Sequence, residues 1–172
     1  LIIYDDEGDA TKAQNFATKL IEEDKVLAVI GPTLSGTSLK IIGIATENET
    51  PLISCAAAAS IVEPVNERKW IFKTAQSDKL AVQRLYKYIS SKGMKKIAII
   101  TVSNSFGQSG KNFLETLAKD YGLEIVENQT FGPEDSDMKA QLTKIKSAKP
   151  DAIICWGTNP GPAYVVRNAK EL

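Results

Sequence analysis

The sequence predicts an α/β fold in which parallel sheets are flanked by helices, and two observations lead to this prediction. Short apolar runs typical of strands alternate with segments whose apolar residues recur at helical spacing. The apolar runs are also continuous rather than alternating, as in strands that are buried on both faces of a parallel sheet. The expected strands are residues 26–30, 52–54, 70–73, 96–101, 123–127 and 152–156, and residues 1–4 are expected to end a further strand.

Helical spacing is clearest in residues 10–23, where Phe16 and Leu20 belong to a row of apolar side chains three or four positions apart. Asp9 and Thr11 are the expected caps at its start. The other expected helices are residues 38–47, 79–90, 111–120, 138–147 and 163–172.

The strand–helix–strand order occurs twice along the chain, and the polar segment TAQSD at 74–78 separates the two occurrences. We therefore expect two lobes, residues 1–75 and 76–172, with a crossover near 74–78. The loops that follow the strands could converge on one cleft. These loops are residues 33–38, 55–60, 103–107 and 157–162.

Composition argues against several classes of protein. The 172 residues include 21 basic and 21 acidic side chains, and this balance gives no indication of a nucleic-acid partner. Histidine is absent, which removes the commonest general base, the Ser–His and Cys–His nucleophile pairs and most zinc chemistry. The chain also has no phosphate-binding loop and no GxSxG elbow, so we expect no enzyme, no metal and no cofactor.

The two cysteines, Cys55 and Cys155, have no CxxC spacing and lie at or just after apolar runs. Buried, reduced thiols are the expectation, and a disulfide between them stays an alternative. No apolar run approaches the length of a membrane span, and the chain does not begin with Met, which suggests a fragment.

The segment KVLAVIGPTLSGTS at 25–38 is a candidate anion site, because an apolar strand passes through a short loop into a helix. Helix N-termini offer N–H groups and the positive end of the helix dipole to a carboxylate or phosphate. Ser35, Thr37 and Ser38 either bind such an anion or cap the helix.

A run of minimal side chains follows the next strand. Ala56, Ala57 and Ala58 would leave space for a ligand and expose backbone groups at the carboxyl end of the sheet, where open α/β sheets bind ligands. Close packing is the alternative explanation for these small residues.

Six motifs in register over nearly the whole chain resemble the type I periplasmic binding proteins. They are YDD, VIGPTLSGTS, NETPLISCAAA, WIFKTAQSD, KKIAIITVSNSFGQSG and PDAIICWG. Within that group the chain is similar to the branched-chain amino acid (leucine/isoleucine/valine) receptors of ABC transporters. The resemblance implies two Rossmann-like lobes with the ligand between them, and a chain that covers only a central part of the family fold.

The resemblance also implies ligand contacts. Ser35 corresponds to a serine that binds the ligand carboxylate, with Thr37 and Ser38 close by, and the backbone at Ala56–Ala58 corresponds to a stretch that holds carboxylate and ammonium. Ala58 replaces the family's threonine. In the second lobe, Phe106 replaces a tyrosine that closes over the ligand, and Trp156 or Thr158 corresponds to a cleft-lining contact in the 156–159 loop.

By the same resemblance, the expected function is capture of a branched-chain or other apolar amino acid, followed by closure about 74–78 and docking on a membrane permease. A periplasmic or extracellular location is implied, with lipid anchoring as one form of it. The apolar residues at 58 and 106 make an aromatic or aliphatic carboxylate an alternative ligand. The effector-binding domain of a transcriptional regulator is a second alternative, although the sequence contains no DNA-binding helix-turn-helix.

Overall fold

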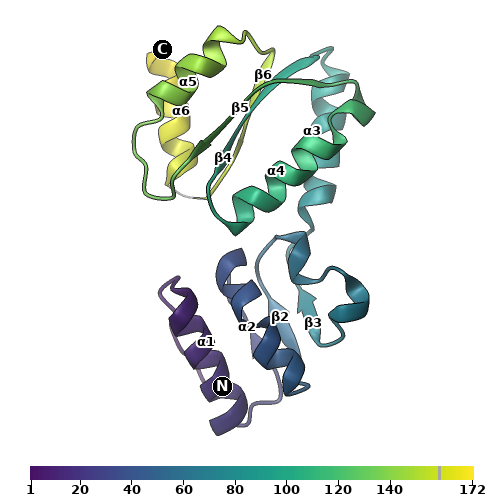
Figure 1. The fold of residues 1–172 in the computed structure, drawn as a ribbon, viewed down its shortest axis with the longest axis vertical. Helices are drawn as coiled ribbons and strands as arrows, with labels where there is room; N and C mark the ends of the chain where they lie inside the picture. The colour runs from purple at the N-terminus through teal and green to yellow at the C-terminus, as the bar shows by residue number, and fades with distance from the viewer. Residues whose placement is uncertain (159) are drawn as a thin grey trace. The chain divides into compact units, whose positions relative to one another are not determined.

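The structure, a computed structural model, describes residues 1–158 and 160–172 and contains two compact units, Leu1–Ser77 and Asp78–Leu172 (Figure 1). Each unit contains one three-stranded parallel sheet. The α/β class with parallel sheets flanked by helices, predicted from the sequence, is therefore confirmed. Among the described residues, no helix combines the length and apolar character that crossing a bilayer requires.

The sheet of the first unit has the order β1-β2-β3 and is covered on one face by two helices (Figure 1). Val29, Leu52 and Ile71 lie opposite one another in register, and all three are buried against the helices. The elements are α1 (Ala10–Thr18), a π-helical turn (Lys19–Glu23), β1 (Val29–Ile30), α2 (Ser35–Glu47), β2 (Leu52–Ser54), the 3-10 turns Ala59–Ile61 and Val65–Glu67, and β3 (Ile71–Lys73).

The other face of this sheet carries the register row Ile30, Ile53 and Phe72. Ile30 is 74% exposed and Phe72 is 52% exposed, so the prediction that these strands are buried on both faces is wrong for this unit as described. The reason is that α1 and α2, the unit's two long helices, both pack against the row that contains Val29.

Residues 1–4 were expected to end a strand, and the structure assigns them to none. A strand requires a ladder to a neighbour, and no described segment pairs with these residues. Tyr4 instead stacks on Phe16 with ring centroids 4.9 Å apart, and its hydroxyl donates to Asp24 at 3.0 Å. Asp9 caps α1 as predicted, because its side chain accepts from the Lys12 N–H.

The sheet of the second unit has the order β5-β4-β6 and is covered on both faces (Figure 1). Ile97 and Ile99 of the central strand pack against α3 and α4, whereas Ala98 and Ile100 pack against α5 and α6. The elements are α3 (Asp78–Ser91), β4 (Lys96–Val102), α4 (Ser105–Leu117), a 3-10 turn (Lys119–Tyr121), β5 (Glu124–Phe131), α5 (Lys139–Ser147), β6 (Ala152–Trp156) and α6 (Gly161–Glu171).

Two helices begin earlier than the sequence suggested. α2 begins at Ser35 rather than near residue 38, and α4 begins at Ser105 rather than at 111. Asn104 caps α4 by accepting from the Gly107 N–H at 3.0 Å. Gly107 and Gly110 had indicated a loop in the sequence, but the structure places both within α4.

These two glycines allow a close approach between α4 and the sheet. A Cβ on Gly107 would lie 1.7 Å from the carbonyl oxygen of Val102, and a Cβ on Gly110 would lie 2.1 Å from Nε1 of Trp156. Neither distance is possible for a larger residue without movement of the backbone or the indole ring. The glycines therefore let the first turns of α4 rest directly on β4 and β6.

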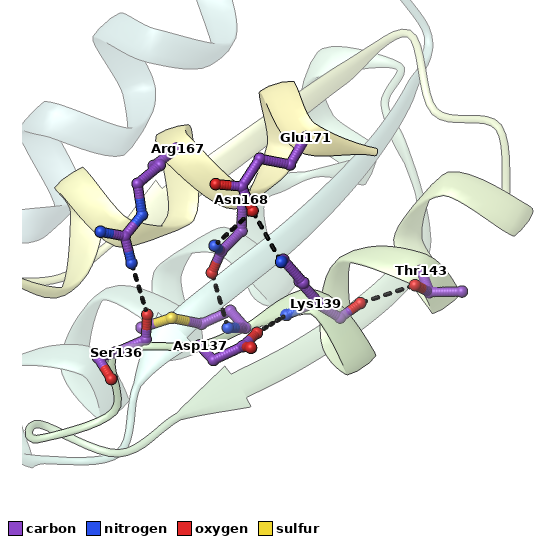
Figure 2. A network of polar contacts seen from close by, with 8 residues as sticks. Ser136, Asp137, Lys139, Thr143, Arg167, Asn168 and Glu171 are labelled. Carbon is purple, nitrogen blue, oxygen red and sulfur yellow. Dashed lines mark hydrogen bonds and ion pairs between the residues drawn. The ribbon is translucent and has the colours of Figure 1, made fainter.

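A polar network fastens the segment before α5 to α6 (Figure 2). Asn168, which is 2% exposed, accepts from the Met138 N–H at 2.9 Å. Lys139 forms a 2.9 Å ion pair with Glu171, and Arg167 donates to the carbonyl of Ser136 at 3.2 Å. These contacts tie two neighbouring segments of the fold together, and we assign the network a structural role.

Replacing Gly110 by alanine is expected to lower the free energy of unfolding by about 1–3 kcal/mol, because the added methyl group would overlap the Trp156 ring. Gly43→Ala is the matched control, since Gly43 lies within α2 and a Cβ added there would meet nothing within 4 Å. The control should gain about 0.5–1 kcal/mol from helix propensity. Urea unfolding followed by circular dichroism measures both variants, and equal stabilities would contradict the packing argument.

Candidate ligand-binding site

The carboxyl edge of the first unit's sheet brings together the segments that follow β1, β2 and β3. The Cys55 N–H donates to the carbonyl of Pro32 at 3.0 Å, and the Thr74 N–H donates to the carbonyl of Ser54 at 3.0 Å. The strand ladder thus continues past the last residues of the strands. As a result, the start of α2, the alanine run and the end of β3 lie beside one another.

A buried chain of hydrogen bonds connects the first two of these segments. Ser38 Oγ lies 3.3 Å from the carbonyl oxygen of Pro32 and 2.8 Å from Ser54 Oγ, which also lies 3.1 Å from the Ala56 N–H. The carbonyl can only accept and the N–H can only donate, so the direction of every bond is set. Ala56 donates to Ser54, Ser54 donates to Ser38, and Ser38 donates to Pro32.

This direction matters for the predicted role of Ser38. Its single proton goes to the Pro32 carbonyl, and the side chain is fully buried. Thr37 is also buried, and its hydroxyl donates to the carbonyl of Leu34 at 3.0 Å. A carboxylate ligand needs a donor, so the geometry assigns both hydroxyls to the fold, and a ligand contact at either residue stays a prediction from the sequence.

Ser35 differs from these two residues. Its Oγ accepts from the Ala58 N–H at 3.3 Å, which leaves the hydroxyl proton available for another acceptor. The residue opens α2, and Leu34 before it provides no side-chain cap. Ser35 is 4% exposed, so little of its surface is accessible to a ligand.

The alanine run lies beside Ser35, and Ala57 is its most accessible alanine, whereas Ala56 and Ala58 are buried. Lys73 extends from the end of β3 and donates from Nζ to the carbonyl of Ala57 at 2.6 Å. A weaker contact joins the same nitrogen to the carbonyl of Ala58 at 3.5 Å. Sequence reasoning missed Lys73, although a cationic residue at the last position of a predicted strand was a signal that could have drawn attention to it.

In the second unit, the predicted aromatic residues lie together. Phe106 in the first turn of α4 stacks on Trp156 at the end of β6, with ring centroids 5.6 Å apart and planes 28° apart. Both rings are half-buried. Thr158 is exposed, and residue 159, at the end of the predicted loop, lies outside the described residues.

The two cysteines are free thiols and are half-buried. Burial raises the pKa of the Cys155 thiol to about 11. Within residues 1–158 and 160–172, no group of three or more cysteine, aspartate or glutamate side chains is placed to hold a metal ion.

Cys155 should react slowly with iodoacetamide at pH 8, because a thiol with a pKa of about 11 is almost entirely protonated there and the thiolate is the nucleophile. The same cysteine in urea, with an ordinary pKa, should react roughly 100-fold faster. Peptide mass spectrometry over a time course gives both rates. Equal rates in the folded and unfolded protein would contradict the burial of this thiol.

Ser54→Ala should lower the free energy of unfolding by about 1–3 kcal/mol, because it leaves the buried Ala56 N–H without its acceptor. Ser60→Ala, at an exposed position of the same unit, is the control and should change stability by less than about 0.5 kcal/mol. Urea unfolding distinguishes them. If both variants matched the parent protein, the hydroxyl chain would not be a stabilising element.

Parallel α/β units with small-residue loops at the carboxyl ends of their strands are an architecture that binds small ligands. The chain belongs to the periplasmic binding protein family, whose sequence model matches residues 1–172. The family and the type I fold expected from the six motifs are thereby confirmed.

Individual relatives agree with this assignment. A Leu/Ile/Val-binding protein of Rhizobium johnstonii is 24% identical over 173 residues, which cover 100% of this chain and 47% of that protein. An extracellular ligand-binding receptor from Rhodopseudomonas palustris HaA2 superposes with a TM-score of 0.93 at 35% identity, over 98% of this chain and 47% of the other.

A third relative was solved with a ligand. The branched-chain amino acid transporter substrate-binding protein of Streptococcus pneumoniae, in complex with isoleucine, has a TM-score of 0.86 and 26% identity, over 99% of this chain and 48% of its own. The chain thus spans about half the length of each of these three relatives.

Proposed function

We propose that the chain is the ligand-binding part of a solute receptor that captures a small apolar carboxylate, in first place a branched-chain amino acid. The observation that carries this proposal is the hydroxyl of Ser35, which accepts from the Ala58 N–H and still has its proton to donate. Family membership and the names of the relatives support the ligand class.

The start of α2 is suited to a carboxylate for a second reason. The first N–H groups of a helix have no acceptor within the helix, and the helix dipole places partial positive charge at that end. At α2 these groups follow directly on Leu34 and Ser35, where no side-chain cap competes for them. We propose that they and the Ser35 hydroxyl bind the two carboxylate oxygens.

For the apolar part of the ligand, we propose contacts with Phe106, Trp156 and Thr158. The stacked pair of Phe106 and Trp156 offers an aromatic surface, and its position is held by the close approach of α4. The backbone of Ala56, Ala57 and Ala58 is the proposed contact for the polar end of the ligand.

An aromatic or aliphatic carboxylate without an amino group is the second candidate ligand, and one observation favours it. Ala58 and Phe106, both in predicted contact positions, have no side-chain hydroxyl or amide that could bind an ammonium group. A ligand without an amino group would bring no ammonium group that needs a hydrogen-bond partner in the site.

The remaining parts of the proposal concern the whole protein. We propose lobe boundaries at residues 1–75 and 76–172, with the segment 74–78 as the hinge that lets ligand contacts shift the receptor between two states. We also propose a periplasmic or extracellular location, with lipid anchoring as one form of it. The membrane permease of an ABC transporter is the proposed partner, and family membership supports both.

Calorimetric titration with leucine, isoleucine, valine, benzoate and hexanoate tests the function and separates the two ligand classes. Binding of the amino acids alone would favour the first candidate, and binding of the simple carboxylates alone would favour the second. Leucinamide is the matched control ligand, because it lacks the carboxylate and should bind far more weakly than leucine. No heat change with any of these compounds would contradict the proposed ligand class.

Ser35→Ala should weaken binding of the carboxylate ligand by about 1.5–3 kcal/mol, roughly 10- to 150-fold, because a hydrogen bond to a charged group is lost. Thr11→Ala, at an exposed position of α1 outside the loops that follow the strands, should leave the affinity unchanged. An unchanged affinity for Ser35→Ala would show that this serine serves only the fold.

A further inference from the structure

Lys73 is a cationic side chain that donates a short hydrogen bond at the carboxyl edge of the first unit, and the sequence analysis did not identify it as a site residue. Its Nζ donates to the carbonyl of Ala57 at 2.6 Å, and the N–H of Ala58 donates to Ser35 Oγ at 3.3 Å. The Ala57 carbonyl and the Ala58 N–H belong to the same peptide group. One peptide plane is therefore held from both sides, by a lysine on β3 and by a serine on α2.

We propose that Lys73 is a positioning residue that orients the Ser35 hydroxyl for a carboxylate through the Ala57–Ala58 peptide group. This inference deepens the proposed function and rests on it. The order of donors is Lys73 Nζ to the Ala57 carbonyl, the Ala58 N–H to Ser35 Oγ, and the Ser35 proton to the ligand.

The strand register explains why Lys73 can reach this peptide. Lys73 lies opposite Ser54, the last residue of β2, and the two strands are parallel. Paired residues point their side chains to the same face of a sheet, so the lysine and the buried Ser54 hydroxyl lie on the face that α2 covers. From there the side chain passes along residues 55–57 to the Ala57 carbonyl.

The alanine run is held both by packing and by hydrogen bonds. Ala56 and Ala58 are buried in the core of the first unit, and side chains from β2, α2 and β3 bind the backbone of the run. Ser54 accepts from Ala56, Ser35 accepts from Ala58, and Lys73 donates to the carbonyls of Ala57 and Ala58. Lys73 thus binds the carbonyl side of the run.

The lysine also acts on the strength of the chain of hydrogen bonds. A cationic donor on a carbonyl polarises the peptide group, which makes its N–H a stronger donor to the next acceptor. The Ser35 hydroxyl, whose oxygen accepts from that N–H, in turn becomes a stronger donor to the ligand. Removal of the lysine should therefore weaken the Ser35–carboxylate bond even though Lys73 itself need not touch the ligand.

The test combines Lys73→Met, Lys73→Arg and Ser35→Ala with calorimetry on the carboxylate that the parent protein binds. Lys73→Met keeps the length of the side chain without its donors and should weaken binding roughly tenfold. Lys73→Arg restores a cationic donor and should recover most of the affinity. Lys40→Met, which replaces an exposed lysine of α2, removes the same charge elsewhere and should have no effect.

Coupling to Ser35 separates positioning from a merely structural role. If Lys73 acts through Ser35, the effect of Lys73→Met should be several-fold smaller in the Ser35→Ala background than in the parent. Equal effects in the two backgrounds would overturn the proposal, and so would a Lys73→Arg variant that binds no better than Lys73→Met.

A measurement without ligand distinguishes failure of this inference from failure of the proposed function. In Lys73→Met, the Ala58 amide hydrogen should exchange at least several-fold faster than in Lys40→Met, because its peptide group has lost one of its two supports. Unchanged exchange would overturn the inference whether or not any carboxylate binds. Faster exchange in a protein that binds no carboxylate would support the peptide contact and contradict the ligand class.

Discussion

The buried hydrogen-bond chain from Ala56 through Ser54 and Ser38 to Pro32 is the constraint on which the candidate site depends. Buried polar groups must be satisfied, and here four groups from three segments satisfy one another. This requirement fixes the start of α2 against the end of β2. Because that distance is fixed, Ser35 can reach the Ala58 N–H, and the first turn of α2 opens onto the alanine run. The position of the Ser35 hydroxyl at this edge thus follows from contacts that are themselves fully used by the fold.

The second unit is constrained by packing rather than by polar groups. Gly107 and Gly110 let α4 approach the sheet so closely that a single methyl group could not be added at either position. The approach places Phe106 over Trp156 and covers one side of the indole. The two units therefore offer different chemistry at the carboxyl ends of their strands, with backbone and hydroxyl donors in the first and an aromatic surface in the second.

Family membership and local geometry answer different questions about this chain. The family gives the fold and the class of receptor, and its relatives carry names that refer to leucine, isoleucine and valine. The geometry identifies which hydroxyl groups still have a proton that they can donate to another acceptor. Three neighbouring hydroxyls at 35, 37 and 38 looked equivalent in the sequence, but only Ser35 keeps its proton, because Thr37 and Ser38 donate to the carbonyls of Leu34 and Pro32.

The sequence alone determined the α/β class, the parallel strands and the family, because continuous apolar runs and local motifs are properties of neighbouring residues. It also identified Ser35, the alanine run, Phe106 and Trp156 as candidates. Only the tertiary structure decided why a glycine stands at position 110 within α4, since Gly110 is explained by a contact with Trp156, which lies elsewhere in the chain. The tertiary structure also decided what Lys73 contacts. The register of β2 and β3 brings its side chain to the carbonyl of Ala57, which lies sixteen residues away along the chain. Such long-range contacts depend on how the segments pack, and no local pattern of residues specifies them.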